Sequence, residues 1–160
     1  MRNDFRIGLL TIITAFALAM MPLPDWAEKL RPDWVALVLI YWAMALPERV
    51  GVTYAFFAGL MLDVVYGTIL GQHAIGLVLV VFFVLMQHQR MRVSSLLQQA
   101  LVVFVLLLLK SVLVLWVDGM VGRSAGSWLY FAPSLISAMI WPWVFIVLRD
   151  LRRKFVYRAM

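Results

Sequence analysis

One carboxylate and one ammonium group lie inside long apolar stretches of this chain. Asp63 falls within the run 50–70 and Lys110 within the run 96–117. A charged side chain is costly inside a bilayer and normally faces an ion pair, a partner or a watery cavity rather than lipid. Each residue lies seven positions before the end of its run, which places both about 10 Å below the same membrane boundary. We therefore predict an ion pair between Asp63 and Lys110 that ties the two helices together.

A second interpretation keeps these two groups apart. The long stem of Lys110 allows its ammonium to snorkel outward to the membrane surface. Asp63 is then protonated, or is capped by Tyr66 or by a hydroxyl group. Strictly additive losses of stability in a double-mutant cycle would favour this interpretation over the ion pair.

The chain offers few groups for catalysis. It contains no cysteine, and its two histidines, His73 and His88, fall at opposite ends of the apolar run 73–89. Ser111 follows Lys110, but adjacent positions of a helix do not face each other, which disfavours a Ser/Lys dyad. A proton relay through Asp63 lacks a second deep acid or histidine. We therefore predict a protein that is not an enzyme and that has no catalytic residue, cofactor or metal.

Small residues recur at every fourth position around Asp63. This spacing keeps them on one slowly drifting face of a helix, where missing side chains let another backbone come close. Two partners are open: another helix of the same bundle, or a helix of a different protein. We hypothesise that the face provides a groove for a foreign helix. Its residues are Gly51, Ala55, Gly59, Gly67 and Gly71.

The composition indicates an integral membrane protein. Hydrophobic residues make up 65% of the 160 positions and charged residues 14%, whereas soluble domains are about half apolar. We expect an all-α fold in a single domain, with short links between the spans. The six predicted transmembrane helices cover residues 7–23, 33–46, 50–70, 73–89, 96–117 and 128–148.

The distribution of basic residues predicts the topology. If six helices start inside, the inner side carries ten Lys and Arg residues and the outer links carry three, Lys29, Arg31 and Arg123. The positive-inside rule then places both termini in the cytoplasm. The span after Pro32 is short, covering roughly 20 Å of a core about 30 Å thick, but omitting it would move the basic end outside.

The chain ends in a basic tail, residues 149–160. Basic side chains beside an anionic leaflet gain roughly 1 kcal/mol each, which explains the tail through lipid. Docking of a cytoplasmic protein is the alternative, and nucleic acid is not expected as a partner. The basic residues are Arg149, Arg152, Arg153, Lys154 and Arg158.

Residues 31–74 resemble the MreD family of bacterial rod shape-determining membrane proteins. The resemblance rests on the order and spacing of Pro32, Trp34, Tyr41, Trp42, Pro47, Gly51, Phe56, the GLMLD string from Gly59 to Asp63, and Gly71-Gln72-His73. It implies a non-catalytic scaffold subunit of the cell-elongation (rod) complex in the bacterial inner membrane. The implied partners are MreC, MreB, RodA and a class B penicillin-binding protein. The implied bundle is similar to the S components of energy-coupling-factor transporters.

That likeness in fold brings a rival function, a small-solute-binding membrane subunit of a transporter. Its pocket would lie in the outer half of the bundle, around Asp63, Tyr66, His73 and Lys110. Binding pockets usually present several polar groups around an apolar cavity. From the sequence we expect few polar groups to converge at one place, which favours the scaffold.

Overall fold

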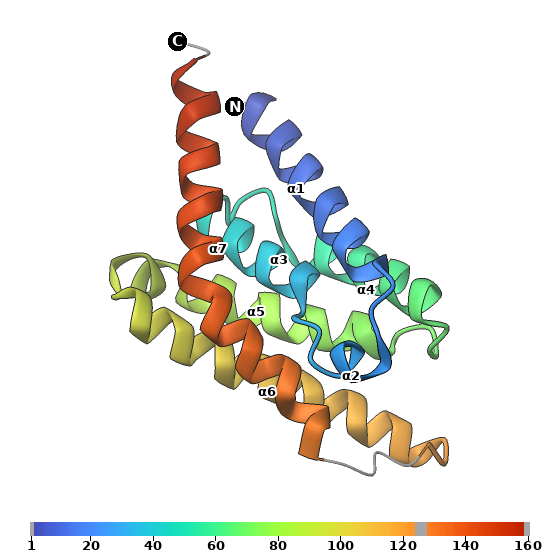
Figure 1. Cartoon of the computed structure of the whole chain (residues 1–160). Coiled ribbons are helices and arrows are strands. Elements are labelled where there is room, and N and C mark those ends of the chain that lie inside the picture. The colour runs from blue at the N-terminus through green and yellow to red at the C-terminus, as the bar shows by residue number, and fades with distance from the viewer. Residues whose placement is uncertain (1, 124–127, 159–160) are drawn as a thin grey trace.

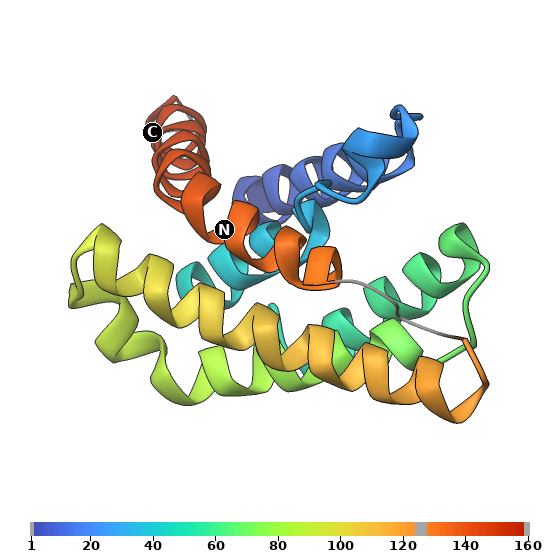
Figure 2. The ribbon, with the colours of Figure 1, turned by 60° about the horizontal axis from the view of Figure 1, so that its bottom comes forward.

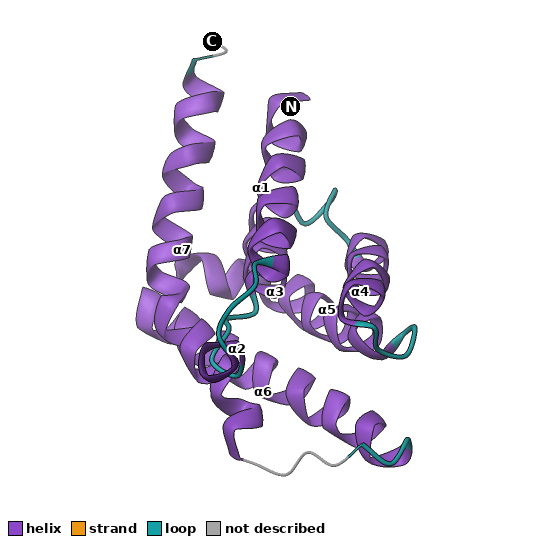
Figure 3. Cartoon of the chain, turned by 45° about the vertical axis from the view of Figure 1, so that its right-hand side comes forward, coloured by secondary structure: helices purple, strands orange, loops and turns teal. Residues whose placement is uncertain are grey.

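The computed structural model describes residues 2–123 and 128–158, and every regular element in that part of the chain is helical (Figure 3). Side chains are described for residues 3–123, 128–155 and 158. The predicted all-α class is therefore confirmed. In chain order the elements are α1 (Arg2–Met20), α2 (Asp25–Glu28), α3 (Trp34–Ala45), α4 (Val52–Tyr66), α5 (Gln72–Val93), α6 (Leu96–Met120), the 3-10 turn η1 (Trp128–Phe131) and α7 (Ala132–Tyr157).

Each of the six predicted apolar runs overlaps one of the longer helices. Four of these, α1, α5, α6 and α7, are long and apolar enough to cross a membrane. The other two are shorter, with 12 residues in α3 and 15 in α4. The helix expected over 50–70 ends at Tyr66, because Gly67 takes a left-handed conformation with φ of 63° and closes the helix.

The short helix α3 forms the core of the bundle. Its residues from Val35 to Met44 are all buried, as expected for a helix that is hydrophobic on every side. It packs against α1, α5 and α7. The indole N–H of Trp42, which is fully buried, donates to the Thr11 hydroxyl of α1 at 2.8 Å.

The remaining helices are layered around this core (Figures 1 and 2). Helix α4 packs mainly on α5, which in turn contacts α3 and α6. Helix α6 packs on α7, and the hydroxyls of Ser111 and Ser134 lie 3.0 Å apart between these two helices.

Arginine side chains satisfy the carbonyl groups at the ends of two helices. The last carbonyls of a helix have no partner within it. Arg31 donates to the carbonyls of Ala19 and, at 2.6 Å, of Met21 at the end of α1. Arg92 of α5 donates to the carbonyls of Met44 and Ala45 at 2.6 and 3.0 Å. These bonds fix the end of α1 to the start of α3, and the end of α3 to α5.

The basic segment predicted as a tail is largely a continuation of α7. This helix runs for 26 residues and extends past Arg149 to Tyr157, while residues 159–160 lie outside the described part. Pro142 lies within it, and the helix changes direction along its length (Figure 1). The two ends of the chain lie at the same end of the molecule, where Arg152 Nε is 3.8 Å from Asp4 Oδ1.

Candidate functional site

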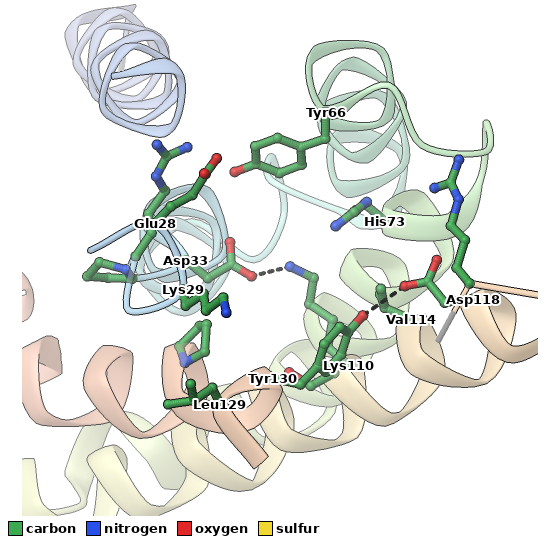
Figure 4. Close-up of a pocket in the computed structure, with 15 residues that line it drawn as sticks. Glu28, Lys29, Asp33, Tyr66, His73, Lys110, Val114, Asp118, Leu129 and Tyr130 are labelled. Carbon is green, nitrogen blue, oxygen red and sulfur yellow. Dashed lines mark hydrogen bonds and ion pairs between the residues drawn. The ribbon is translucent and has the colours of Figure 1, made fainter. Parts of the chain in front are cut away.

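A polar cavity of about 720 Å³ opens at the end of the molecule opposite the two termini. It lies where α2 meets the first turns of α3, α5 and α7 and the last turns of α4 and α6. Its lining contains charges of both signs and several neutral polar groups (Figure 4). The basic residues are Lys29, Arg31, Lys110 and Arg123, the acidic residues Glu28, Asp33 and Asp118, and the neutral polar residues Tyr66, His73, Ser111 and Tyr130.

Lys110 forms an ion pair with Asp33 on the wall of this cavity. The Lys110 residue is only 6% exposed. Asp33 is the N-cap of α3, and its carboxylate also accepts from the backbone N–H of Ala36 at 3.3 Å. The pair joins α3 to α6.

The stem of Lys110 reaches Asp33 by crossing α5 at a glycine. A Cβ atom added to Gly76 would lie 2.7 Å from Lys110 Cγ. Glycine at this position therefore leaves the room that the lysine stem occupies.

The predicted ion pair between Asp63 and Lys110 is wrong, because each group has a different partner. Asp63 is fully buried and accepts from the backbone N–H groups of Gly71 and His73 at 2.8 and 2.9 Å, and from the Thr68 hydroxyl at 2.8 Å. Its Oδ1 also lies 2.8 Å from His73 Nδ1. Since α4 ends at Tyr66, the chain folds back and brings the start of α5 onto this carboxylate. Asp63 is thus capped partly by a hydroxyl, as in the second interpretation.

Asp118, near the end of α6, is held by two neutral donors. The Gln72 amide donates to its Oδ1 at 2.9 Å, and the Tyr130 hydroxyl donates to its Oδ2 at 3.2 Å. The Gln72 amide also donates to the Val114 carbonyl at 3.2 Å, while its own oxygen is buried without a hydrogen-bond partner among the described residues. These contacts join α5, α6 and η1 at the cavity.

The expectation that few polar groups converge is therefore wrong. Tyr66, His73 and Lys110 all line the cavity, as the rival function requires. Asp63 lies behind His73 and holds its ring, rather than lining the cavity itself.

The small-residue face does not form one continuous groove. Ala55 is fully buried, and a Cβ atom added to Gly59 would lie 2.2 Å from the Ala74 Cα atom of α5. The chain's own bundle therefore occupies this part of the face. Gly67 and Gly71 lie beyond the end of α4 and have φ of 63° and 102°, so they form the turn into α5. Gly51 lies at the N-cap of α4, with no atom within 4 Å of an added Cβ.

A second, apolar cleft of about 160 Å³ lies between α1 and α4, over α3. Leu39 and Trp42 of α3 contribute to it, and Leu9 of α1 and Met61 of α4 lie on its two sides. The last two side chains are 49% and 59% exposed. Near one end the rings of Phe5 and Tyr54 approach to 6.4 Å between centroids.

Sequence reasoning did not assign most of the polar residues of the cavity to it, among them Asp33, Asp118 and Tyr130. Each of these three lies at the boundary of an apolar run, where polar residues are usually assigned to the membrane surface. The available signal was Asp33 directly before an apolar helix, which is typical of an N-cap. Its partner Lys110 is 77 positions away, and no local spacing relates the two.

No group of three or more His, Cys, Asp or Glu residues suited to a metal ion is found among the described residues. His73 contacts Asp63, and His88 Nδ1 lies 2.7 Å from the Leu85 carbonyl oxygen. The Ser111 hydroxyl faces Ser134.

Comparison with known proteins agrees with the features seen in residues 31–74. The family model for the rod shape-determining protein MreD matches residues 1–151. The chain is also 31% identical over 158 residues to the rod shape-determining protein MreD of Haemophilus influenzae. The aligned region covers 96% of this chain and 98% of that relative. No solved structure matches the chain significantly, so the expected likeness to S components stays a prediction. The chain belongs to the MreD family of rod shape-determining membrane proteins.

Proposed function

We propose that this chain is a non-catalytic scaffold subunit of the cell-elongation complex in the bacterial inner membrane. In this role it binds MreC and supports lateral peptidoglycan synthesis by RodA and a class B penicillin-binding protein. The observation that carries the proposal is the match to the MreD family over residues 1–151. The described chain is made almost entirely of apolar helices joined by short links, which suits a subunit that works through contacts within the membrane.

We further propose six membrane crossings with both termini in the cytoplasm. Four helices are long enough to cross alone. Helix α3 is short, but it is enclosed by other helices, so the membrane around it need not match its length. Both termini lie at one end of the molecule (Figure 1), as an even number of crossings requires.

The proposed seat for the MreC span is the apolar cleft between α1 and α4. The small-residue face around Gly59 leaves no room for a foreign helix, because α5 fills that face. The α1–α4 cleft instead has exposed apolar walls and an apolar floor provided by α3. A single transmembrane helix is the occupant proposed for it, since helices associate in membranes by close packing rather than by hydrophobic burial alone.

The basic end of α7 is proposed to lie at the cytoplasmic membrane surface. Arg149, Arg153, Lys154 and Arg158 are exposed, so they are available to anionic lipid headgroups or to a cytoplasmic partner such as MreB. Arg152 is less exposed and lies beside Asp4.

Filling the cleft tests the proposed seat. Leu9→Trp and Met61→Trp place a large ring between α1 and α4 and should reduce the amount of MreC that co-purifies by about tenfold, which corresponds to about 1.4 kcal/mol. Leu101→Trp and Met139→Trp are matched controls, because these side chains are also exposed and apolar but do not line the cleft. MreC retention equal to wild type in both cleft variants would refute the seat.

A further inference from the structure

The polar cavity contains more charged groups than a structural ion pair needs. Lys110 and Asp33 alone would join α6 to α3. The same cavity is also lined by Lys29, Glu28 and Asp118, and a volume of about 720 Å³ stays open between them (Figure 4). Ligand pockets commonly measure about 300–1,000 Å³. The cavity therefore has the size and the polar lining of a binding site.

The polar groups of the cavity are held in place from behind. Asp63 accepts the N–H groups that start α5 and contacts the ring of His73. Gln72 and Tyr130 orient Asp118. Such supporting contacts fix the positions of binding groups before a ligand arrives, which reduces the entropy lost on binding.

The charges of the lining restrict the ligand. Four basic and three acidic side chains face the cavity, so a ligand of one charge sign would meet almost as many like charges as opposite ones. A ligand that carries both signs satisfies both sets. Charge-assisted hydrogen bonds are roughly twice as strong as neutral ones, which makes a dipolar ligand the best match to this lining.

We propose that this cavity binds a small zwitterion, a molecule that carries an ammonium group and an oxyanion a few bonds apart. Asp33 and Asp118 line it as acceptors for the ammonium, and Lys110 and Lys29 line it as donors to the oxyanion. Such a group can belong to a soluble solute or to the headgroup of phosphatidylethanolamine. The proposal develops the small-solute alternative and does not depend on MreC binding.

Binding is tested on the purified full-length protein in nanodiscs that contain only phosphatidylglycerol. The soluble zwitterions are glycerophosphoethanolamine and β-alanine, and the single-charge controls are glycerol phosphate and ethanolamine. Calorimetry should detect binding of at least one zwitterion, with each single-charge control at least tenfold weaker. A single-charge control that binds as tightly as the zwitterions overturns the proposal. If no soluble zwitterion binds, the lipid headgroup is the remaining source, and a second measurement decides that case.

Native mass spectrometry of the protein released from mixed bilayers makes that second measurement. Preferential retention of phosphatidylethanolamine over phosphatidylglycerol, lost in the cavity variants below, supports the lipid source. Equal retention of both lipids, together with no binding of the soluble zwitterions, overturns the proposal.

The variants assign any binding to the cavity. The double variant Asp33→Asn/Lys110→Met removes both charges of the pair and leaves neither unpaired, and it should weaken zwitterion binding at least tenfold. The matched control is Asp150→Asn/Lys154→Met, an acid and a base at the far end of α7. Unchanged binding in the cavity variant contradicts the assignment.

A rim variant keeps the test decisive if that double variant does not fold. Glu28→Gln/Lys29→Gln changes two exposed side chains of α2 and its C-cap, which carry little of the bundle's packing. It should weaken zwitterion binding several-fold while MreC retention stays at the wild-type level. Wild-type affinity in this variant overturns the proposal.

Discussion

The close contact between α4 and α5 makes a quantitative prediction about Gly59. An alanine Cβ at this position would lie 2.2 Å from Ala74 Cα, 2.6 Å from Ala74 N and 3.0 Å from Ala74 Cβ. Carbon atoms pack best at about 3.5–4.0 Å, so α4 and α5 would have to separate by about 1.5 Å. The nearest atoms belong to the backbone of α5, which cannot rotate away as a side chain can.

The expected cost of Gly59→Ala follows from two opposing terms. Overpacking in a well-packed interior costs about 1–3 kcal/mol, and contact with a backbone places this site near the upper value. Alanine is favoured over glycine in a helix by about 1 kcal/mol. The net loss of stability is therefore about 2 kcal/mol.

Equilibrium unfolding in mixed detergent micelles, followed by tryptophan fluorescence, measures this loss. Gly119→Ala is the matched control, because Gly119 lies in α6 with no atom within 4 Å of an added Cβ. It should leave stability unchanged or raise it by up to about 1 kcal/mol. If Gly59→Ala behaves like Gly119→Ala, the close contact between α4 and α5 is refuted.

Three further predictions concern the polar contacts. Lys110→Met alone leaves the carboxylate of Asp33 without its ammonium partner, and because that side chain is 22% exposed the loss should fall below the about 3–5 kcal/mol of a fully buried pair. The double variant with Asp33→Asn should lose less stability than the sum of the two single variants, and strict additivity would contradict the pair. Asp63→Asn and Lys110→Met should add within about 0.5 kcal/mol in the same assay, and a larger coupling would restore the pair predicted from the sequence. Gly76→Ala should lower stability less than Gly59→Ala, because the nearest atom is the movable Lys110 Cγ at 2.7 Å; an equal or larger loss would count against this account.

The order and approximate positions of the six longer helices were predictable, because each coincides with an apolar run. The short run after Pro32 is an example: its hydrophobic character on every side matches the complete burial of α3. The early end of α4 was not predictable from hydropathy, because Gly67 and Gly71 continue the small-residue spacing while their left-handed backbone closes the helix. Spacing alone does not distinguish a glycine that packs from a glycine that turns.

The site was only partly predictable for a related reason. Lys110 was recognised as a buried charge that needs a partner, and depth in the membrane selected Asp63. Depth does not specify which side of a helix a group faces. The true partner of Lys110, Asp33, is the N-cap of α3 and lies at the start of another apolar run. The turn at Gly67 gives Asp63 its own hydrogen-bond donors, which follow that turn in the chain.

The measurement that tests the proposed function most directly is site-specific cross-linking between this chain and MreC. The chain contains no cysteine, so single cysteines at Leu9 and Met61 in the cleft, and at Met139 outside it, give unambiguous positions. Each is combined with a series of single cysteines along the MreC span. We expect disulfides from Leu9 and Met61 that recur every three to four positions of the span, and none from Met139. Cross-links from Met139 alone, or from none of the three, would contradict the proposed seat.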